Sequence, residues 1–272
     1  MKKDLNKLYM KQDILSQLES LNAPKDSIVL MHSSFRLIGN VDGGAKALLD
    51  TLIEYFTSDG GLFCIPTHTW HNIDKEITLD MNDPSTCLGI LSDLAAADPR
   101  GIRSHNPTHS IVVFGNRSRA IELIKDEGSI CTGTAPESAY GKLCREGGYV
   151  LLVGVAHDKN TYLHCVEEML GIPERLTEKP YTLTVKLESG ELLKQNIHLC
   201  HSSFTNDISQ RFRKYETAFR YRGAIRDGFI GNAPTQLCDA RIMKETVGLI
   251  VERSNGADPL KDEFSIAPKL YR

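Results

Sequence analysis

The sequence predicts an α/β fold whose central sheet is mixed and largely parallel. Apolar residues run without interruption over 28–31, 61–66 and 149–155, as expected of strands buried on both faces. A helical apolar pattern over 45–56 lies between the first two runs, and this strand–helix–strand order is typical of parallel pairing. The 272 residues are 41% hydrophobic, which is enough for a sizeable core. A single domain over 1–272 is therefore expected.

The first half of the chain alternates strands and helices. The expected elements are a surface helix over 8–21, a strand over 26–31, a helix over 45–56, a strand over 61–66, a helix over 88–97, a strand over 110–114 and a helix over 118–125. Residues 71–87 are rich in Asn, Asp and Thr and predict a long loop over a site.

The second half begins in the same way and then changes character. The expected elements are a helix over 138–145, a strand over 149–155, a helix over 161–170, a β-hairpin with strands over 181–187 and 192–199, a helix over 204–219, a short strand pair beginning at Phe229-Ile230-Gly231 and a helix over 239–253. The change predicts a C-terminal β-hairpin and helical portion, with a sub-lobe over 178–236.

Charge and cysteine content narrow the class of protein. The 32 basic and 35 acidic residues give a net charge of -3, without the basic excess of a nucleic-acid binder. No apolar run is long enough to span a membrane, and the N-terminus lacks the apolar core of a signal peptide. Seven dispersed cysteines without a Cys-x-x-Cys pair indicate reduced thiols. A cytoplasmic protein is expected, and monomer and homodimer both stay open.

The stretch from Asn160 to Glu168 is the strongest candidate for chemistry. It follows the apolar strand over 149–155 and begins a helix, a common place for ligand sites in open α/β sheets. His164 lies three residues before Glu167 and four before Glu168, so either carboxylate shares its helix face. A histidine oriented by a carboxylate suits a general base. The alternative is an ion pair on the helix surface.

Several histidines are also candidate metal ligands. A zinc-binding helix would carry His-Glu-x-x-His, whereas this helix has one histidine. No metal site is therefore predicted. A metal hydrolase that uses some subset of the histidines stays open as an alternative, with candidates His32, His68, His105, His157 and His164.

Three loops could bind phosphate or an oxyanion. Serine hydroxyls and backbone N–H groups stabilise such anions, and arginine matches phosphate with a bidentate fork. The candidates are His32, Ser33, Ser34 and Phe35 after the first strand; Arg103, Ser104, His105 and Ser110 before a later strand; and Ser138, Tyr140, Gly141 and Lys142 at a helix start. The alternatives are ordinary serine turns, a solvated loop and a plain helix cap.

Together these stretches resemble the aminoglycoside 3-N-acetyltransferase family and, within it, YokD-type bacterial members. The matching segments occur in family order from about residue 27 to 251: His32-Ser33-Ser34-Phe35 with Gly43-Gly44, Pro66-Thr67-His68-Thr69-Trp70, Arg103-Ser104-His105-Asn106-Pro107 through Ser110, Ser138 with Gly141, Asn160-Thr161 through His164 and Glu167, Gly231-Asn232-Ala233, and Leu237-Cys238-Asp239-Ala240-Arg241.

The resemblance implies a three-layer α/β/α sandwich with a mixed sheet. It also implies acetyl-coenzyme A as donor, with direct transfer of the acetyl group to an amine. His164 supported by Glu167 would be the general base, and the three loops above would hold the coenzyme. Oxyanion stabilisation would come from hydroxyls or N–H groups near Ser33 and Ser34.

The acceptor is expected to be a small cationic amine, with the aminoglycoside 3-amino group first. Several ammonium groups need an acidic cleft. Substrate contacts are expected from Thr67, Asp74, Glu76 and Asn160. Departures from the family pattern occur at His68, Ala139 and Val166, and they put the acceptor in more doubt than the donor. A different amine acceptor and a coenzyme A-binding protein of little or no activity stay open.

Overall fold

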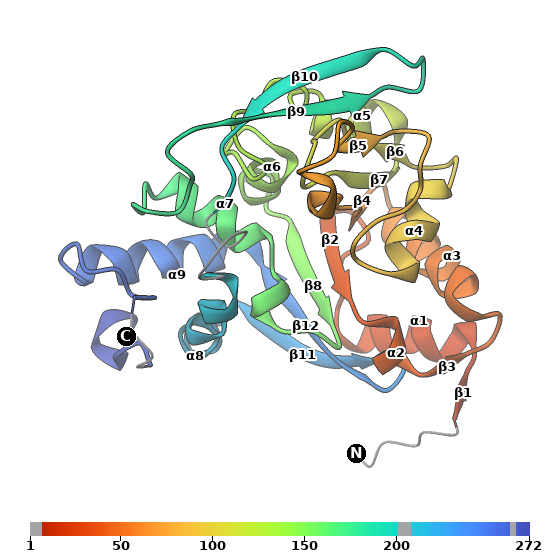
Figure 1. The fold of residues 1–272 in the computed structure, drawn as a ribbon. Coiled ribbons are helices and arrows are strands. Elements are labelled where there is room, and N and C mark those ends of the chain that lie inside the picture. The colour runs from red at the N-terminus through yellow and green to blue at the C-terminus, as the bar shows by residue number, and fades with distance from the viewer. Residues whose placement is uncertain (1–6, 201–207, 262–264) are drawn as a thin grey trace.

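A seven-stranded mixed sheet forms the centre of the molecule in a computed structural model that describes residues 7–200, 208–261 and 265–272 (Figure 1). In the described chain, its strand order is β11-β12-β8-β2-β4-β7-β6. The strands are β2 (Ile28–Ser33), β4 (Leu62–Pro66), β6 (Ile102–Arg103), β7 (Ile111–Gly115), β8 (Tyr149–Val153), β11 (Ile225–Ile230) and β12 (Ala233–Asp239).

Parallel pairing is confined to the middle of this sheet. β2 pairs parallel with β4 and with β8, whereas β4–β7, β6–β7, β8–β12 and β11–β12 are antiparallel. The α/β class and the mixed sheet are confirmed, but the expectation of a largely parallel sheet is wrong. β6 is an edge strand of the sheet, and the chain reverses direction after it to form the antiparallel strand β7. A strand of two residues is too short to show a hydrophobic period.

Helices cover both faces of the sheet, which confirms the three-layer architecture. Side chains alternate along each strand, so Val29 and Phe63 face one helical layer while Leu30 and Cys64 face the other. One layer contains α1 (Lys11–Ser20), α3 (Gly44–Thr57) and α4 (Ile90–Ala97). The opposite layer contains α5 (Arg117–Ile124), α6 (Ala139–Arg145), α7 (Tyr162–Met169), α8 (Glu216–Tyr221) and α9 (Ala240–Arg253).

Two smaller sheets flank the sandwich. The predicted hairpin forms as β9 (Tyr181–Lys186) and β10 (Leu192–Ile197), and β9 also pairs with β5 (Leu79–Asp80). This hairpin extends along the top of the molecule in Figure 1. The second sheet joins β1 (Leu8–Tyr9) and β3 (Asn40–Val41). Short helical turns complete the described elements: α2 (Phe35–Ile38), η1 (Trp70–Asn72), η2 (His157–Lys159), η4 (Ile208–Tyr215) and η5 (Pro268–Leu270).

The C-terminal half departs from expectation in two places. The helix expected over 204–219 is a 3-10 segment, η4, followed by α8, and its residues 204–207 lie outside the described chain. The short strand pair begins at Ile225 rather than Phe229 and joins the large sheet. Gly228 and the polar residues of β11 weaken the apolar alternation by which a strand is recognised.

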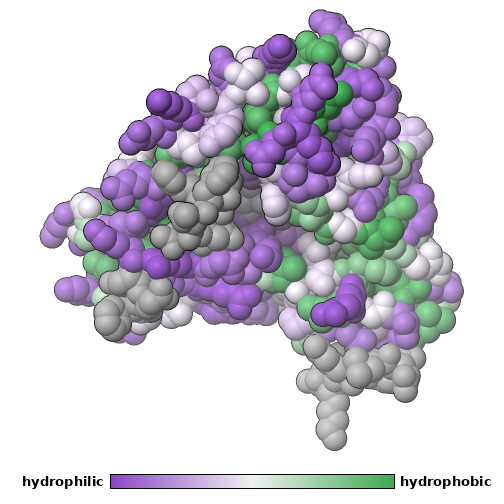
Figure 2. Space-filling view, viewed as in Figure 1, coloured by the Kyte–Doolittle hydropathy of each residue, from purple (hydrophilic) through white to green (hydrophobic). Residues whose placement is uncertain are grey.

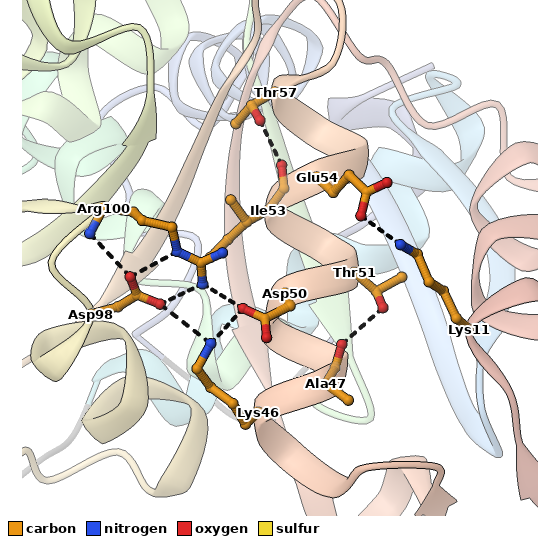
Figure 3. A network of polar contacts seen from close by, with 10 residues as sticks. All are labelled: Lys11, Lys46, Ala47, Asp50, Thr51, Ile53, Glu54, Thr57, Asp98 and Arg100. Carbon is orange, nitrogen blue, oxygen red and sulfur yellow. Dashed lines mark hydrogen bonds and ion pairs between the residues drawn. The ribbon is translucent and has the colours of Figure 1, made fainter.

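A charged network ties α3 to the turn after α4 (Figure 3). The Asp98 carboxylate, whose side chain is 3% exposed, accepts from the Arg100 guanidinium. Lys46 and Arg100 both also contact Asp50 on α3. The network therefore joins two helices of the same layer.

Among the described residues, no helix is both long and apolar enough to cross a bilayer. Hydrophilic side chains cover much of the face seen in Figure 2, while apolar residues gather over α3 and α4.

Candidate active site

A cavity of about 1050 Å³ opens beyond the C-terminal ends of β2, β4 and β8. β2 pairs in parallel with β4 on one side and with β8 on the other. The connections to these two strands therefore diverge at the C-terminal end of β2, which is the topological switch point of the sheet. Ligands of open α/β sheets bind in such a crevice. Seven of the predicted site residues line it: His32, Ser33, Ser34, Phe35, Asp74, Asn160 and His164.

His164 reaches the cavity from the first turns of α7. The backbone N–H of His164 donates to Thr161 O at 3.1 Å, at the start of the helix. The imidazole packs edge-on against Phe212, with ring centroids 4.9 Å apart, and the residue is 9% exposed. The ring is thus confined by apolar packing while it still lines the cavity.

Glu167 lies one helical turn further on and is deeply buried. Its Oε2 accepts a hydrogen bond from Arg175 Nε at 2.8 Å, and Arg175 in turn forms a bidentate ion pair with Asp258. Burial raises the pKa of Glu167 to about 7, and Arg175 opposes that rise. Glu167 Oε1 has no hydrogen-bond partner. Glu167 follows His164 by three residues, so the two residues lie on the same face of α7.

Glu168, the other candidate carboxylate, is held by the preceding loop. Its two oxygens accept from Thr132 Oγ1 at 2.6 Å and Thr134 Oγ1 at 2.5 Å. Burial raises its pKa, while the two hydroxyls oppose that rise. Both oxygens therefore have partners that tie α7 to the loop before α6.

Asn160 presents an unsatisfied oxygen at the cavity. Its Nδ2 lies 3.2 Å from His157 Nδ1, whereas its Oδ1 is buried without a hydrogen-bond partner. A buried amide oxygen without a partner costs about 1–3 kcal/mol, so such atoms often mark a ligand position. Asn160 precedes α7, and both Asn160 and His164 line the cavity.

The His32–Phe35 segment forms another wall. Burial lowers the pKa of His32 to about 3, and its Nε2 has no hydrogen-bond partner. Ser33 ends β2, and Ser34 and Phe35 begin α2 at the cavity. The Ser34 N–H donates to Val153 O at 2.9 Å, so this amide is committed to the scaffold. Ser33 and Ser34 both line the cavity, and their hydroxyls are candidate ligand contacts.

The Arg103 loop is mostly bonded internally. The buried Arg103 guanidinium donates to Thr67 O at 3.0 Å, Thr67 Oγ1 at 3.3 Å and Asp83 O at 2.7 Å. Ser110 Oγ donates to Thr67 O, and Ser104 Oγ accepts from the Ile111 amide. The structure places Arg103, Ser104, His105, Ser110 and Thr67 outside the described lining of the cavity.

The Ser138–Lys142 segment also points elsewhere. Ser138 is fully buried, and Lys142 pairs with Asp126 at 2.7 Å on the outer side of α6. A Cβ on Gly141 would lie 1.9 Å from Pro136 O, so glycine is required for close backbone approach. These residues, like Tyr140, shape the support beneath the cavity and do not line it.

Two histidines that were not among the expected catalytic, coenzyme or acceptor contacts line the cavity. His68 and His109 pack edge to face with ring centroids 4.7 Å apart. Tyr140 Oη lies 3.0 Å from His68 Nε2 and donates to His109 O at 3.0 Å. Burial lowers the pKa of both rings, for His109 to about 3 with a further lowering by His164. Their position before or after a buried strand was the available signal.

The charged lining is sparse among the described residues. Asp74 and Asp158 are its acidic side chains, and Arg36 and Lys159 its basic ones. Asp158 already pairs with Arg213 at 2.7 Å. Asp74 on the 71–87 loop is exposed at the mouth, whereas the nearby Glu76 lies outside the lining.

The metal alternative receives no support from the side-chain arrangement. No group of three or more His, Cys, Asp or Glu side chains within residues 7–200, 208–261 and 265–272 is placed to hold a metal ion.

An α/β sandwich with a histidine at the carboxyl edge of its parallel strands is the setting of a group-transfer or hydrolytic enzyme, and comparison with known proteins narrows this class. A family model for aminoglycoside 3-N-acetyltransferase matches residues 30–249. The chain belongs to this family. It is therefore an acyltransferase that uses acetyl-coenzyme A as its acetyl donor.

Individual relatives agree with this assignment. The chain is 27% identical over 258 residues to aminoglycoside N(3)-acetyltransferase IV of Salmonella sp, a match that covers 93% of this chain and 89% of the relative. Two solved structures share the fold. YokD from Bacillus subtilis has a TM-score of 0.78 at 22% identity, over 93% of this chain and 97% of that chain. A binary complex of AAC-IIIb with CoASH has a TM-score of 0.75 at 19% identity, over 91% and 98%.

Proposed function

We propose that the cavity transfers the acetyl group of acetyl-coenzyme A to an amino group of an aminoglycoside, the 3-amino group first, with His164 as general base. The observation that carries the proposal is His164 at the cavity, four residues after the unpartnered Asn160 oxygen. A solved relative of the same fold binds CoASH, and a relative from Salmonella sp is named for aminoglycoside N(3)-acetylation.

The reaction follows from this arrangement. His164 removes a proton from the neutral acceptor amine as the nitrogen lone pair bonds to the thioester carbonyl carbon. The tetrahedral intermediate then collapses, the carbon–sulfur bond breaks, and the thiolate leaves. The proton held on His164 is returned to the sulfur or to solvent. General-base action supplies about 10²–10⁴-fold in rate.

Glu167 is the proposed support for the imidazolium that forms. Its unpartnered Oε1 and its place one turn after His164 fit this role, whereas both oxygens of Glu168 have partners. Arg175 keeps Glu167 able to ionise near neutral pH, because it opposes the burial that raises the pKa of this carboxyl. A carboxylate near a histidine favours its charged form.

The acceptor is proposed to bind between Asn160 and the mouth. Asn160 Oδ1 accepts a hydrogen bond from the reacting amine or a neighbouring hydroxyl, and Asp74 attracts a second ammonium group. The proposed coenzyme contacts are His32, Ser33, Ser34 and Phe35. Arg103, Ser138 and the other residues outside the cavity lining are left out of the proposed site.

The test is thiol release from acetyl-coenzyme A across a panel of amines that includes aminoglycosides. The wild-type enzyme is expected to release coenzyme A only when an acceptor is present. His164→Ala is expected to lower turnover by about 10²–10⁴-fold while calorimetry shows unchanged coenzyme affinity. Undiminished turnover in this variant would rule out His164 as the base.

A reducing compartment is the proposed setting. All seven cysteines are free, and Cys64, Cys144, Cys165, Cys200 and Cys238 are buried. Buried free thiols fit the cytoplasm, where disulfides are rare.

A further inference from the structure

We propose that His109 is a second catalytic residue, whose neutral imidazole donates a hydrogen bond from Nε2 to the carbonyl oxygen of the bound thioester. The inference rests on the proposed function. It assigns the oxyanion contact that Ser34 N–H cannot supply, because that amide is bonded to Val153 O.

The geometry of His109 is determined by its surroundings at three points. The His109 N–H donates to Asn106 Oδ1 at 2.9 Å, and its carbonyl accepts from Tyr140 Oη at 3.0 Å. Nδ1 lies 2.9 Å from Thr108 Oγ1. Backbone and ring are thus held in one position, which is the condition for electrostatic stabilisation of a transition state.

The same contacts indicate which ring nitrogen carries the proton. Thr108 is 1% exposed, and its hydroxyl is hydrogen-bonded to His109 Nδ1. A buried hydroxyl hydrogen needs an acceptor, so it donates to Nδ1. The neutral ring then carries its proton on Nε2. That nitrogen has no hydrogen-bond partner among the described residues, and the residue lines the cavity.

His68 has the opposite arrangement, which explains why His109 is the donor. Tyr140 Oη has one hydrogen and donates it to His109 O. The contact of 3.0 Å between Tyr140 Oη and His68 Nε2 therefore uses the proton of His68. His68 is left with an unprotonated Nδ1, which can only accept.

Burial keeps His109 a neutral donor throughout the working range. It lowers the pKa of His109 to about 3, and the charge of His164 lowers it further. His109 therefore does not compete with His164 for the proton of the acceptor. It keeps its own Nε2 proton as negative charge develops on the carbonyl oxygen and as that charge returns to expel the thiolate.

The packing around the His109 ring also depends on a glycine. A Cβ on Gly133 would lie 2.3 Å from His109 Nδ1 and 2.6 Å from Thr108 Oγ1. Gly133 O accepts from Asn106 Nδ2 at 2.8 Å, which holds the glycine backbone against the ring. The absence of a side chain at Gly133 lets the hydroxyl and the imidazole pack in this arrangement.

The test compares His109→Phe, His109→Gln and Thr108→Val with the wild-type enzyme. His109→Phe is expected to lower kcat by about 10²–10³-fold with little change in KM or coenzyme affinity. His109→Gln, which keeps an N–H group, should recover at least about tenfold of that loss. Thr108→Val removes the hydroxyl that selects the tautomer and should give a smaller fall in kcat. The matched control is His105→Gln on the same loop, whose ring lies outside the cavity lining.

The outcomes separate this inference from the proposed function. If no amine is acetylated, or if His164→Ala keeps full turnover, the proposed function fails. If those results hold but His109→Phe turns over at the wild-type rate, only the role of His109 is overturned. The ¹⁵N chemical shifts of His109 in the folded wild-type enzyme give an independent reading. A neutral Nε2–H ring at pH 7 supports the proposal, and an Nδ1–H ring or an imidazolium overturns it.

Discussion

The start of α7 and the loop between β6 and β7 carry similar polar residues and do different work. At α7, Asn160 Oδ1 and Glu167 Oε1 are buried without hydrogen-bond partners, and His164 lines the cavity. In the loop, Arg103, Ser104 and Ser110 all bond to the protein itself. Residue type therefore does not separate a ligand-binding loop from a supporting one. The hydrogen bonds that each polar atom already makes within the protein do distinguish the two kinds of loop.

Replacing Arg103 tests the supporting side of this comparison and should give the largest effect. Arg103→Met removes the guanidinium donor of Asp83 O and one of the two side-chain donors of Thr67 O, and we expect the free energy of unfolding to fall by about 3–5 kcal/mol. Urea unfolding measures this change. Coenzyme affinity of the folded variant should stay near that of the wild type. A stable variant that no longer binds the coenzyme would instead make Arg103 a ligand residue. Arg117→Met, on the exposed start of α5, is the matched control.

Replacing Glu167 tests the α7 side. Glu167→Gln removes the negative charge proposed to stabilise protonated His164, so kcat should fall by about 10–100-fold. Steady-state kinetics against acceptor concentration measure it. Glu168→Gln is the matched control, because both Glu168 oxygens bond to Thr132 and Thr134. A larger loss of kcat in the control would assign the supporting role to Glu168.

The carboxyl group that anchors the β6–β7 loop should make stability depend on pH. Glu127 accepts from Asn106 Nδ2 at 2.6 Å and from the Ala139 N–H at 2.7 Å, and burial raises its pKa from 4.5 to about 7. The folded state then binds more protons than the unfolded state between these values. The contribution of Glu127 is complete below about pH 4.5 and is lost as pH rises through about 7.

We expect the free energy of unfolding to fall by about 3 kcal/mol as this contribution is lost across that window. Thermal unfolding at a series of pH values measures it, and Glu127→Gln should flatten the dependence. Glu122→Gln, at an exposed position of α5, should leave the slope unchanged. An equal slope in Glu127→Gln would show that another group is responsible.

The network of Figure 3 should give the smallest effect, since it contributes to neither region. Asp98→Asn weakens contacts with Lys46 and Arg100, whose side chains are 54% and 47% exposed. Solvent screens such pairs, so the loss should be below about 1 kcal/mol. Raising the salt concentration should reduce the difference between variant and wild type. A salt-independent loss would point to backbone contacts of Asp98 instead.

Long, strongly patterned segments were predictable from the sequence, and short ones were not. The apolar runs that became β2, β4 and β8 and the amphipathic pattern of α3 gave the middle of the sheet. The two-residue strands β5 and β6 show no period. The direction of β7 depends on β6, so the antiparallel edge could not be foreseen.

The site residues can likewise be divided into those that the sequence predicted and those that it did not. His164, Asn160 and the His32–Phe35 segment follow strands whose ends meet at one edge, so chain position predicted that they would lie near a common cavity. Arg103 was expected at the coenzyme because its guanidinium matches phosphate, and Lys142 because it belongs to the helix start at 138–142, but the partners of both side chains lie within the protein. His109 was missed because its significance comes from Thr108, Asn106 and Tyr140 acting together. Such convergence is visible only in three dimensions.

The small sheet of β5, β9 and β10 bears on any attempt to redesign this enzyme. The Thr78 and Met81 N–H groups donate to Thr184 and Lys186 carbonyls, and Lys186 pairs with Asp80, 106 positions away in the chain. Backbone hydrogen bonds therefore hold the loop that carries Asp74 against the β9–β10 hairpin. Transplanting one segment from a relative would leave the other with a mismatched edge, so a change of acceptor preference by chimaera construction has to exchange both together.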